Sequence, residues 1–101
     1  MNEEEYKKSI AAIANFYGYE SQSRQLIEEM AELTVAINKW WRSTGSVEER
    51  AAKRANIVEE IEDVQIMLDQ MIYFLCCYKE VEDVKQAKIW RQLKRMESEE
   101  K

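Results

Sequence analysis

The chain has 101 residues, of which 46% are hydrophobic and 35% charged, and it contains two Gly and no Pro. This balance favours long amphipathic helices in one domain and excludes a chain dominated by strands or disorder. The formal net charge of -5 argues against a general nucleic-acid-binding protein, because phosphate binding needs clustered Lys and Arg.

The first predicted element is a short leading helix within residues 1–19. Its apolar residues Tyr6, Ile10 and Ile13 recur at three- and four-residue steps, which is the spacing of one helix face. Gly18 can end this helix because glycine adopts the left-handed conformation without strain.

Two long helices follow and are predicted to form a hairpin. The first spans about residues 21 to 43 and the second about residues 47 to 77, with a turn-rich cluster between them. Ser46 and Glu49 have the form of a capping box, in which each side chain satisfies the other's backbone amide. The second helix carries an apolar seam that consists of Ile57, Ile61, Val64, Leu68, Met71 and Leu75.

Local residue types predict how these two helices begin and end. Ser21 or Ser23 is expected to cap the first hairpin helix. A bend is expected after the second helix, at residues 78–79. Cys76 and Cys77 stand alone in the chain, and we interpret them as packing residues of that helix rather than as a disulfide framework or a metal site.

A C-terminal helix is predicted over about residues 80 to 97, followed by a frayed tail at residues 98–101. The expected fold is therefore all-α: one domain over residues 1–101, whose core at 20–97 resembles a four-helix bundle built on the hairpin. A domain of this size buries a modest share of its surface, so we expect association with further copies to complete the core.

Two pairs of acidic residues are predicted to meet across the hairpin. Glu29 and Glu32 lie three residues apart in the first helix, as do Glu60 and Asp63 in the second, so each pair shares a helix face. Residue 46, in the predicted turn, is the midpoint between Glu32 and Glu60 and also between Glu29 and Asp63. Folding about this residue brings the four carboxylates together, and we call these four residues the acid cluster.

A divalent cation would relieve the repulsion within the acid cluster. The chain contains no His, so the ligands would be oxygens, which favours Mg²⁺ or Mn²⁺ and argues against a His-containing di-iron bundle. The alternative is an ordinary solvated face, since Asp and Glu together number 20. The acid cluster differs from such a face because each of its pairs borders the apolar seam of its helix.

Polar residues are predicted on either side of the acid cluster. About residue 46, Lys39 is mirrored by Lys53 and Gln22 by Gln70, which places cations at one end of the cluster and amides at the other. The lysines are candidates for contact with a polyphosphate, although exposed lysines near a turn are common without such a role.

The C-terminal helix carries a basic stripe. Lys88, Arg91 and Arg95 recur at three- and four-residue steps, and Gln92 lies beside them. These residues are candidates for phosphate binding. The alternative is that basic residues near the end of a helix complement its dipole.

The sequence EEMAE at residues 28–32, followed by EIED at 60–63, resembles the signature of MazG-like nucleotide pyrophosphohydrolases, the all-α NTP pyrophosphatase superfamily. The surrounding segments and a final helix containing KIWRQLKRM extend the resemblance over about residues 20 to 97. The resemblance implies Mg²⁺-dependent hydrolysis of a nucleoside triphosphate between its α and β phosphates, giving the monophosphate and pyrophosphate. It also implies a homodimer or homotetramer.

Carried over by position, the resemblance implies that the acid cluster holds the metal and that Lys88 contacts phosphate. Family members often have Asn one helical turn after this lysine, whereas the chain has Gln92, so a substrate contact at that position stays open. A side chain that accepts the proton of the attacking water must be an acid, and Glu28 and Glu29 are the candidates.

The main alternative to an enzyme is a non-enzymatic helical interaction module, such as a coiled-coil or antitoxin-like protein. It explains the apolar seams but not the shared midpoint at residue 46. No apolar run reaches the roughly 20 residues of a membrane span, and the acidic N-terminus lacks the positive charge of a secretory signal. We therefore expect a cytoplasmic protein without a membrane or nucleic-acid partner.

Overall fold

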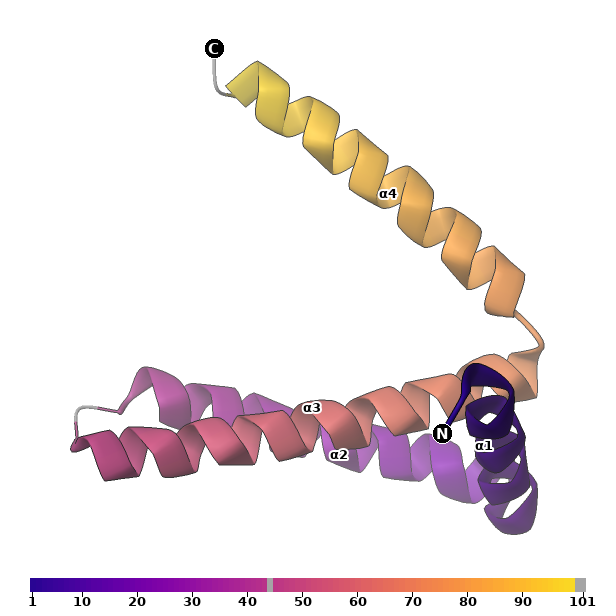
Figure 1. The fold of residues 1–101 in the computed structure, drawn as a ribbon, viewed down its shortest axis with the longest axis horizontal. Coiled ribbons are helices and arrows are strands. Elements are labelled where there is room, and N and C mark those ends of the chain that lie inside the picture. Colours follow the sequence, from indigo (N-terminus) through magenta and orange to yellow (C-terminus); the bar gives the residue numbers. More distant parts are fainter. Residues whose placement is uncertain (44, 100–101) are drawn as a thin grey trace.

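The computed structural model of the protein describes residues 1–43 and 45–99, and over these residues it contains helices and no strand. The helices are α1 (Glu3–Tyr17), α2 (Tyr19–Trp41), α3 (Val47–Leu75) and α4 (Tyr78–Glu99). α2 and α3 run antiparallel, side by side, and form the principal packing contact of the chain (Figure 1). The prediction of an all-α fold built on a helical hairpin is confirmed.

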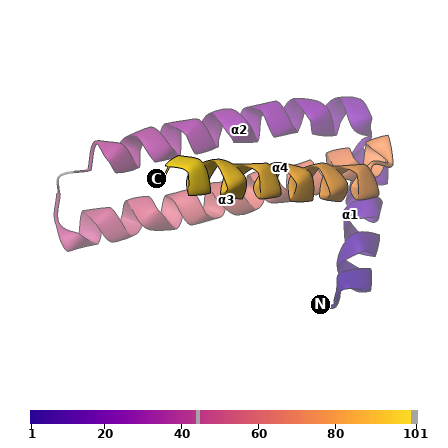
Figure 2. The same cartoon turned by 90° about the horizontal axis from the view of Figure 1, so that it is seen from above.

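α1 and α4 are placed at the end of the hairpin that is remote from its loop. α1 crosses that end and packs on both hairpin helices, whereas α4 starts there and slopes back above the hairpin (Figures 1 and 2). α4 packs on α3 over a small area, and the ammonium group of Lys7 in α1 lies over the ring of Tyr78 at the start of α4. A single chain therefore does not close a bundle of four helices. None of the described helices is long and apolar enough to cross a membrane.

Gly18 joins α1 directly to α2. The chain turns at this residue, whose φ of +88° favours glycine, and α2 begins at the next residue. The predicted serine caps of α2 are wrong for this reason: Ser21 and Ser23 lie within the first two turns of a helix that has already started. The side chain of Asn2 caps α1 by accepting a hydrogen bond from the Glu5 amide at 2.8 Å.

α3 starts at the predicted residue, but only half of the predicted capping box forms, because the Glu49 carboxylate pairs with Lys53 at 2.8 Å. Ser46 precedes the helix in an extended conformation, and its hydroxyl accepts a hydrogen bond from the backbone amide of Glu49 at 3.2 Å. α2 ends at Trp41, two residues before its predicted end, and Thr44 in the predicted turn lies outside the described residues.

The register of the hairpin follows the predicted pivot at residue 46. Gln22 and Gln70 are buried, with exposed fractions of 8% and 1%, and Nε2 of Gln22 donates a hydrogen bond to Oε1 of Gln70 at 2.8 Å. The mirrored pairing of these residues is therefore confirmed. Beside them lies a small apolar core of Leu26, Val64 and Met67.

The turn between α3 and α4 is formed by the two cysteines. α3 ends at Leu75, and Cys76 adopts the left-handed conformation, with φ of 51° and ψ of 40°. The prediction that both cysteines pack within the helix is wrong, because the chain leaves the helix at Cys76, before the predicted bend. α4 then continues to Glu99, two residues past its predicted end, and residues 100 and 101 lie outside the described part.

Replacing Cys76 with Gly is expected to stabilise the protein by about 0.5 to 1 kcal/mol. The left-handed conformation costs a non-glycine residue roughly 1 to 2 kcal/mol, and the greater freedom of glycine in the unfolded chain offsets part of this gain. The Cys76 side chain is exposed, so little packing is lost. Urea unfolding measures the change, and Cys76→Ala is the control because it keeps the strained conformation. Equal stability of the two variants would contradict the prediction.

Hydrogen bonds between side chains hold α1 to α3. The Tyr6 hydroxyl donates to the carboxylate of Asp69, and the side chains of Asn15 and Tyr73 form hydrogen bonds at 2.8 and 3.1 Å. The hydrogen bond to Asp69, together with burial and the charge of the carboxylate, raises the pKa of Tyr6 from 10.0 to about 12. The fold therefore favours the protonated form of Tyr6.

Tyr6→Phe is expected to destabilise the protein by about 1 to 2 kcal/mol at pH 7, since it removes a hydrogen bond to a charged group. This hydrogen bond contributes fully to the free energy of unfolding below pH 10.0, the pKa of an unperturbed tyrosine. The contribution is lost as the pH rises through about 12. Thermal melting of the wild type and of Tyr6→Phe at pH 7 and pH 11 tests this. Other groups that titrate between these pH values are present in both proteins, so their effect cancels in the difference between the two melting temperatures. A constant difference between the two proteins would count against the assignment.

Candidate metal centre

Three members of the acid cluster converge between the hairpin helices. One carboxylate oxygen from each of Glu29, Glu60 and Asp63 lies within 4.8 Å of the other two. α2 contributes Glu29 and α3 contributes the other two, and all three residues are half-buried. The convergence predicted from the common midpoint is thus confirmed for these three carboxylates.

Glu32, the fourth member, lies at the exposed edge of the acid cluster. It is not within the group of three converging oxygens. Its negative charge nevertheless raises the pKa of both Glu29 and Glu60, so it belongs to the same electrostatic environment.

The oxygens of the acid cluster are incompletely satisfied. Oε1 of Glu29 accepts a hydrogen bond from Nε2 of Gln25 at 2.8 Å. Oε2 of Glu29 and Oε2 of Glu60 are buried and have no hydrogen-bond partner. Buried carboxylate oxygens without a donor are unfavourable, so these atoms fit a site that a cation completes.

Burial and mutual repulsion control the protonation of the acid cluster. Burial is the main cause that raises the pKa of Glu60, followed by the charges of Glu32 and Asp63. At Glu29 the hydrogen bond from Gln25 lowers the pKa, but burial and the charges of the same two neighbours outweigh it, and the pKa is raised. Both carboxylates therefore favour a bound proton or another positive charge.

No basic side chain neutralises the three converging carboxylates within the described residues. The salt bridges of this part of the chain join residues three or four apart on one helix, such as Lys53 with Glu49 at 2.8 Å, and none involves Glu29, Glu60 or Asp63. An ordinary solvated acidic face would not bury unpartnered oxygens. Oxygen ligands without nitrogen or sulfur fit Mg²⁺ or Mn²⁺.

Gln25 and Glu62 were not predicted as part of the site. The spacing of Gln25, four residues before Glu29 on the same helix, is the signal that could have identified it. Glu62 is exposed on α3, and the close approach of the Asp63 carboxyl is the main cause that raises its pKa. Sequence spacing could not have identified this residue, because neighbouring helix positions do not ordinarily face each other.

The other predicted site residues of the hairpin lie outside the three converging carboxylates. Glu28 is exposed on α2, next to Glu29 in sequence. Lys39 is exposed near the end of α2, and the ammonium group of Lys53 pairs with Glu49. Neither lysine forms a salt bridge with the acid cluster.

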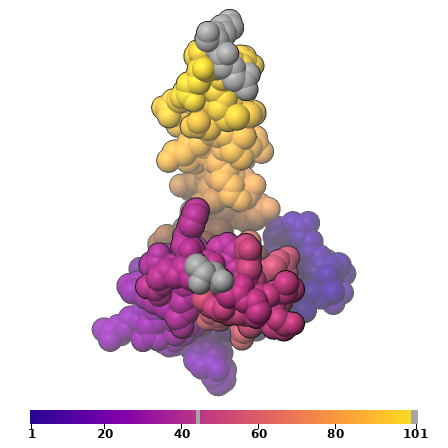
Figure 3. Space-filling view, turned by 90° about the vertical axis from the view of Figure 1, so that its left-hand side faces the viewer, coloured from indigo at the N-terminus to yellow at the C-terminus, as the bar shows by residue number. Residues whose placement is uncertain are grey.

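The predicted basic stripe lies on α4, on a separate arm of the molecule. Lys88, Arg91, Gln92 and Arg95 are exposed, and α4 diverges from the hairpin along its length (Figures 1 and 3). Within the described part of one chain, no salt bridge joins this stripe to the acid cluster.

No protein-family profile matches the chain, and neither does any curated protein or solved structure. The geometry of the acid cluster and the resemblance at residues 28–32 and 60–63 are therefore the features from which a function can be proposed.

Proposed function

We propose that the protein is a Mg²⁺-dependent nucleoside triphosphate pyrophosphohydrolase of the MazG-like type, which cleaves its substrate between the α and β phosphates. The observation that carries this proposal is the convergence of Glu29, Glu60 and Asp63 with two buried, unpartnered oxygens. The EEMAE and EIED segments contain these residues at the positions that the resemblance assigns to metal ligands.

In this proposal Glu29, Glu60 and Asp63 hold the cation, with Glu32 at the exposed edge. Gln25 fixes one oxygen of Glu29 and leaves the other free to act as a ligand. A bound Mg²⁺ would neutralise phosphate oxygens and lower the pKa of an attacking water. Mn²⁺ could replace it at an all-oxygen site.

The remaining side chains have two proposed roles. Glu29, inside the cluster, or Glu28, exposed beside it, accepts the proton of the attacking water. The basic residues bind the triphosphate: Lys88, Arg91 and Arg95, with Gln92 beside them on α4, and Lys39 and Lys53 toward the hairpin loop. The basic stripe on α4 can bind the triphosphate where α4 lies against a hairpin.

The direct test is to incubate the protein with each common dNTP and NTP plus Mg²⁺ and to measure pyrophosphate and the monophosphate. We expect release from at least one nucleotide by the wild type and loss of release in Glu60→Gln. Glu59→Gln is the matched control, because Glu59 precedes Glu60 on α3 and is exposed. Activity that survives in Glu60→Gln would refute the assigned site.

A non-enzymatic helical interaction module is the second candidate function, and the exposed apolar residues favour it. Ile27, Val58 and Trp90 are among the large apolar residues with half or more of their surface exposed. This candidate predicts no pyrophosphate from any nucleotide and no stabilisation by Mg²⁺. It leaves the buried, unpartnered oxygens of the acid cluster unexplained.

A further inference from the structure

Two cysteines stand next to each other at the turn between α3 and α4. Cys76 and Cys77 are free thiols, and the chain contains no other cysteine and no His. Structural zinc sites need four ligands, mostly Cys and His, so two sulfurs without such partners do not fit one. The chain therefore concentrates both of its thiols in one turn, where they can react with each other.

The backbone of this turn releases the two cysteines from helical geometry. Within an α-helix, the side chains of neighbouring residues point about 100° apart around the axis and do not face each other. α3 ends at Leu75, and Cys76 has φ of 51° and ψ of 40°, in the left-handed region. Because the pair lies outside both helices, rotation within the turn can bring the two sulfurs together.

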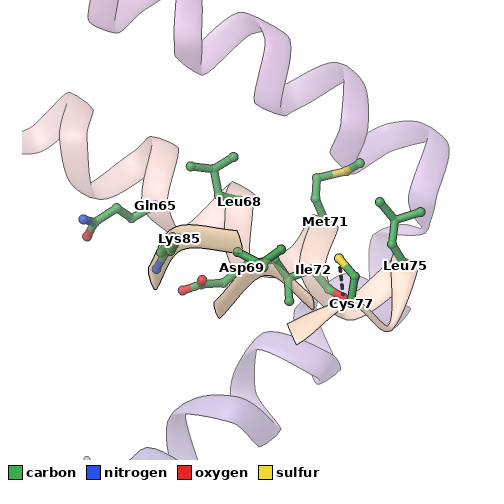
Figure 4. A pocket seen from close by; sticks show the side chains of 9 residues that line it. Gln65, Leu68, Asp69, Met71, Ile72, Leu75, Cys77 and Lys85 are labelled. Atoms are coloured by element: carbon green, nitrogen blue, oxygen red, sulfur yellow. Dashed lines mark hydrogen bonds between the residues drawn. The ribbon is translucent and has the colours of Figure 1, made fainter. Parts of the chain in front are cut away.

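The two thiols differ in their access to water. Cys76 is exposed, whereas Cys77 is half-buried and its Sγ lies 4.0 Å from the carbonyl oxygen of Ile72 (Figure 4). Oxidation of a thiol by a dissolved peroxide requires access from solvent. Cys76 is therefore placed to react first, and Cys77 is the neighbouring thiol that reacts with the product.

A disulfide between adjacent residues is strained and therefore reversible. Consecutive Cα atoms are about 3.8 Å apart, whereas disulfides usually join Cα atoms that are roughly 4.4 to 6.8 Å apart. Strain makes a disulfide easier to reduce, and labile disulfides of this kind are the regulatory ones rather than the structural ones. The position of the two cysteines thus suits a bond that forms and breaks.

The cysteine turn also holds the start of α4. The backbone amide of Cys77 donates to the carbonyl of Ile72 at 3.2 Å, and the carbonyl of Cys77 accepts from the amide of Val81 at 2.9 Å. α4 packs on α3 over a small area. Its apolar stripe is 44% to 59% exposed and consists of Ile89, Leu93 and Met96. The turn is therefore a main determinant of the direction in which α4 leaves the hairpin (Figure 1).

We propose that Cys76 and Cys77 are a redox-active dithiol that hydrogen peroxide converts reversibly into a disulfide, and that this bond loosens the first turn of α4. Closing the ring changes the backbone angles of the turn, so the hydrogen bond between Val81 and Cys77 loses its geometry. The dithiol contains no residue of the acid cluster, so this proposal does not depend on the proposed hydrolysis.

The reaction has two steps and consumes one peroxide. The sulfur of Cys76 attacks an oxygen of the peroxide, the O–O bond breaks, and a sulfenic acid and one water are formed. The sulfur of Cys77 then attacks the sulfur of Cys76, and the second oxygen leaves as water. The two thiols lose two electrons and two protons in total, and the peroxide is reduced to two waters. A small dithiol reverses the reaction by exchange.

Mass spectrometry of the full chain after treatment with hydrogen peroxide tests the disulfide. We expect a single wild-type chain to lose the mass of two hydrogen atoms and to regain it with dithiothreitol. Cys77→Ser should stop at the sulfenic acid, which dimedone traps, whereas Cys76→Ser should react more slowly because Cys77 is half-buried. Circular dichroism checks that each variant keeps its helices.

Hydrogen exchange of the backbone amides tests the effect on α4. The amide of Val81 should be protected in the reduced wild type, and oxidation should speed its exchange by about tenfold, because its hydrogen bond to Cys77 is lost. Cys76→Ser treated with peroxide is the matched control. It keeps one thiol but forms no disulfide within the chain, so its exchange at Val81 should not change.

Three results would overturn the proposal. Oxidation of the wild type to sulfinic acid without the loss of two hydrogens would mean that the two sulfurs do not meet. Equal trapping by dimedone in the wild type and in Cys77→Ser would mean that Cys77 does not react with the sulfenic acid. Unchanged exchange at Val81 in the oxidised wild type would mean that the disulfide does not act on α4. Glu60→Gln should oxidise as the wild type does, which separates this test from that of the acid cluster.

Discussion

Glu60→Gln is expected to raise the melting temperature of the protein without Mg²⁺ and to abolish the further rise that Mg²⁺ produces in the wild type. Glu60 faces two other carboxylates, and burial together with their charges raises its pKa, so its charged form is disfavoured in the fold. A neutral amide of similar shape removes this repulsion. It also removes a proposed metal ligand, which should weaken the proposed hydrolysis by more than about 100-fold, since even indirect partners of metals contribute 10- to 100-fold.

Melting curves with increasing Mg²⁺ measure this effect. At a Mg²⁺ concentration 100 times the dissociation constant, binding would stabilise the wild type by about 2.7 kcal/mol, and the variant should lose this gain. Glu59→Gln, which removes the same charge from an exposed neighbouring position, should retain it. An unchanged Mg²⁺ response in Glu60→Gln would mean that the three carboxylates do not bind the ion.

The hairpin and its register could be predicted because they depend on residues that act locally or at regular spacing. The cap at Ser46 fixes where α3 starts, and helical periodicity then fixes which side chains face α2. The hydrogen bond between Gln22 and Gln70 lies where folding about residue 46 placed it. The convergence of the carboxylates follows from the same register, which is why the candidate site could be anticipated.

Other features depend on backbone conformation or on packing that periodicity does not encode. Cys76 adopts a left-handed conformation that its residue type does not favour, so no residue at this position indicated a turn. Gly18 was expected to end a helix, but nothing indicated that α2 would start at the next residue. The divergence of α4 was not predictable, because its apolar stripe fits a bundle within one chain or between chains equally well.

The buried pair Gln22 and Gln70 is the second position where we expect large effects. Gln70→Leu should destabilise the protein by about 1 to 3 kcal/mol, because it leaves the buried Nε2 of Gln22 without its acceptor. Replacing both residues with Leu should recover most of that loss, since two apolar side chains leave no polar group unsatisfied. The coupling energy of the two substitutions is then on the order of 1 kcal/mol or more. Gln65→Leu is the control, because Gln65 is exposed on the same helix and should change stability by less than about 0.5 kcal/mol.

The double variant separates stability from the function of the site. The amide pair lies one heptad from Glu29 on α2 and from Asp63 on α3, and a polar pair in an apolar seam selects one register among several. Without it, α2 can shift along α3 by a helical turn of about 5.4 Å, which would move Glu29 away from Glu60 and Asp63. We therefore expect a protein of near wild-type stability whose Mg²⁺ response is reduced. A double variant that keeps the full Mg²⁺ response would show that packing of Leu26, Val64 and Met67 alone sets the register.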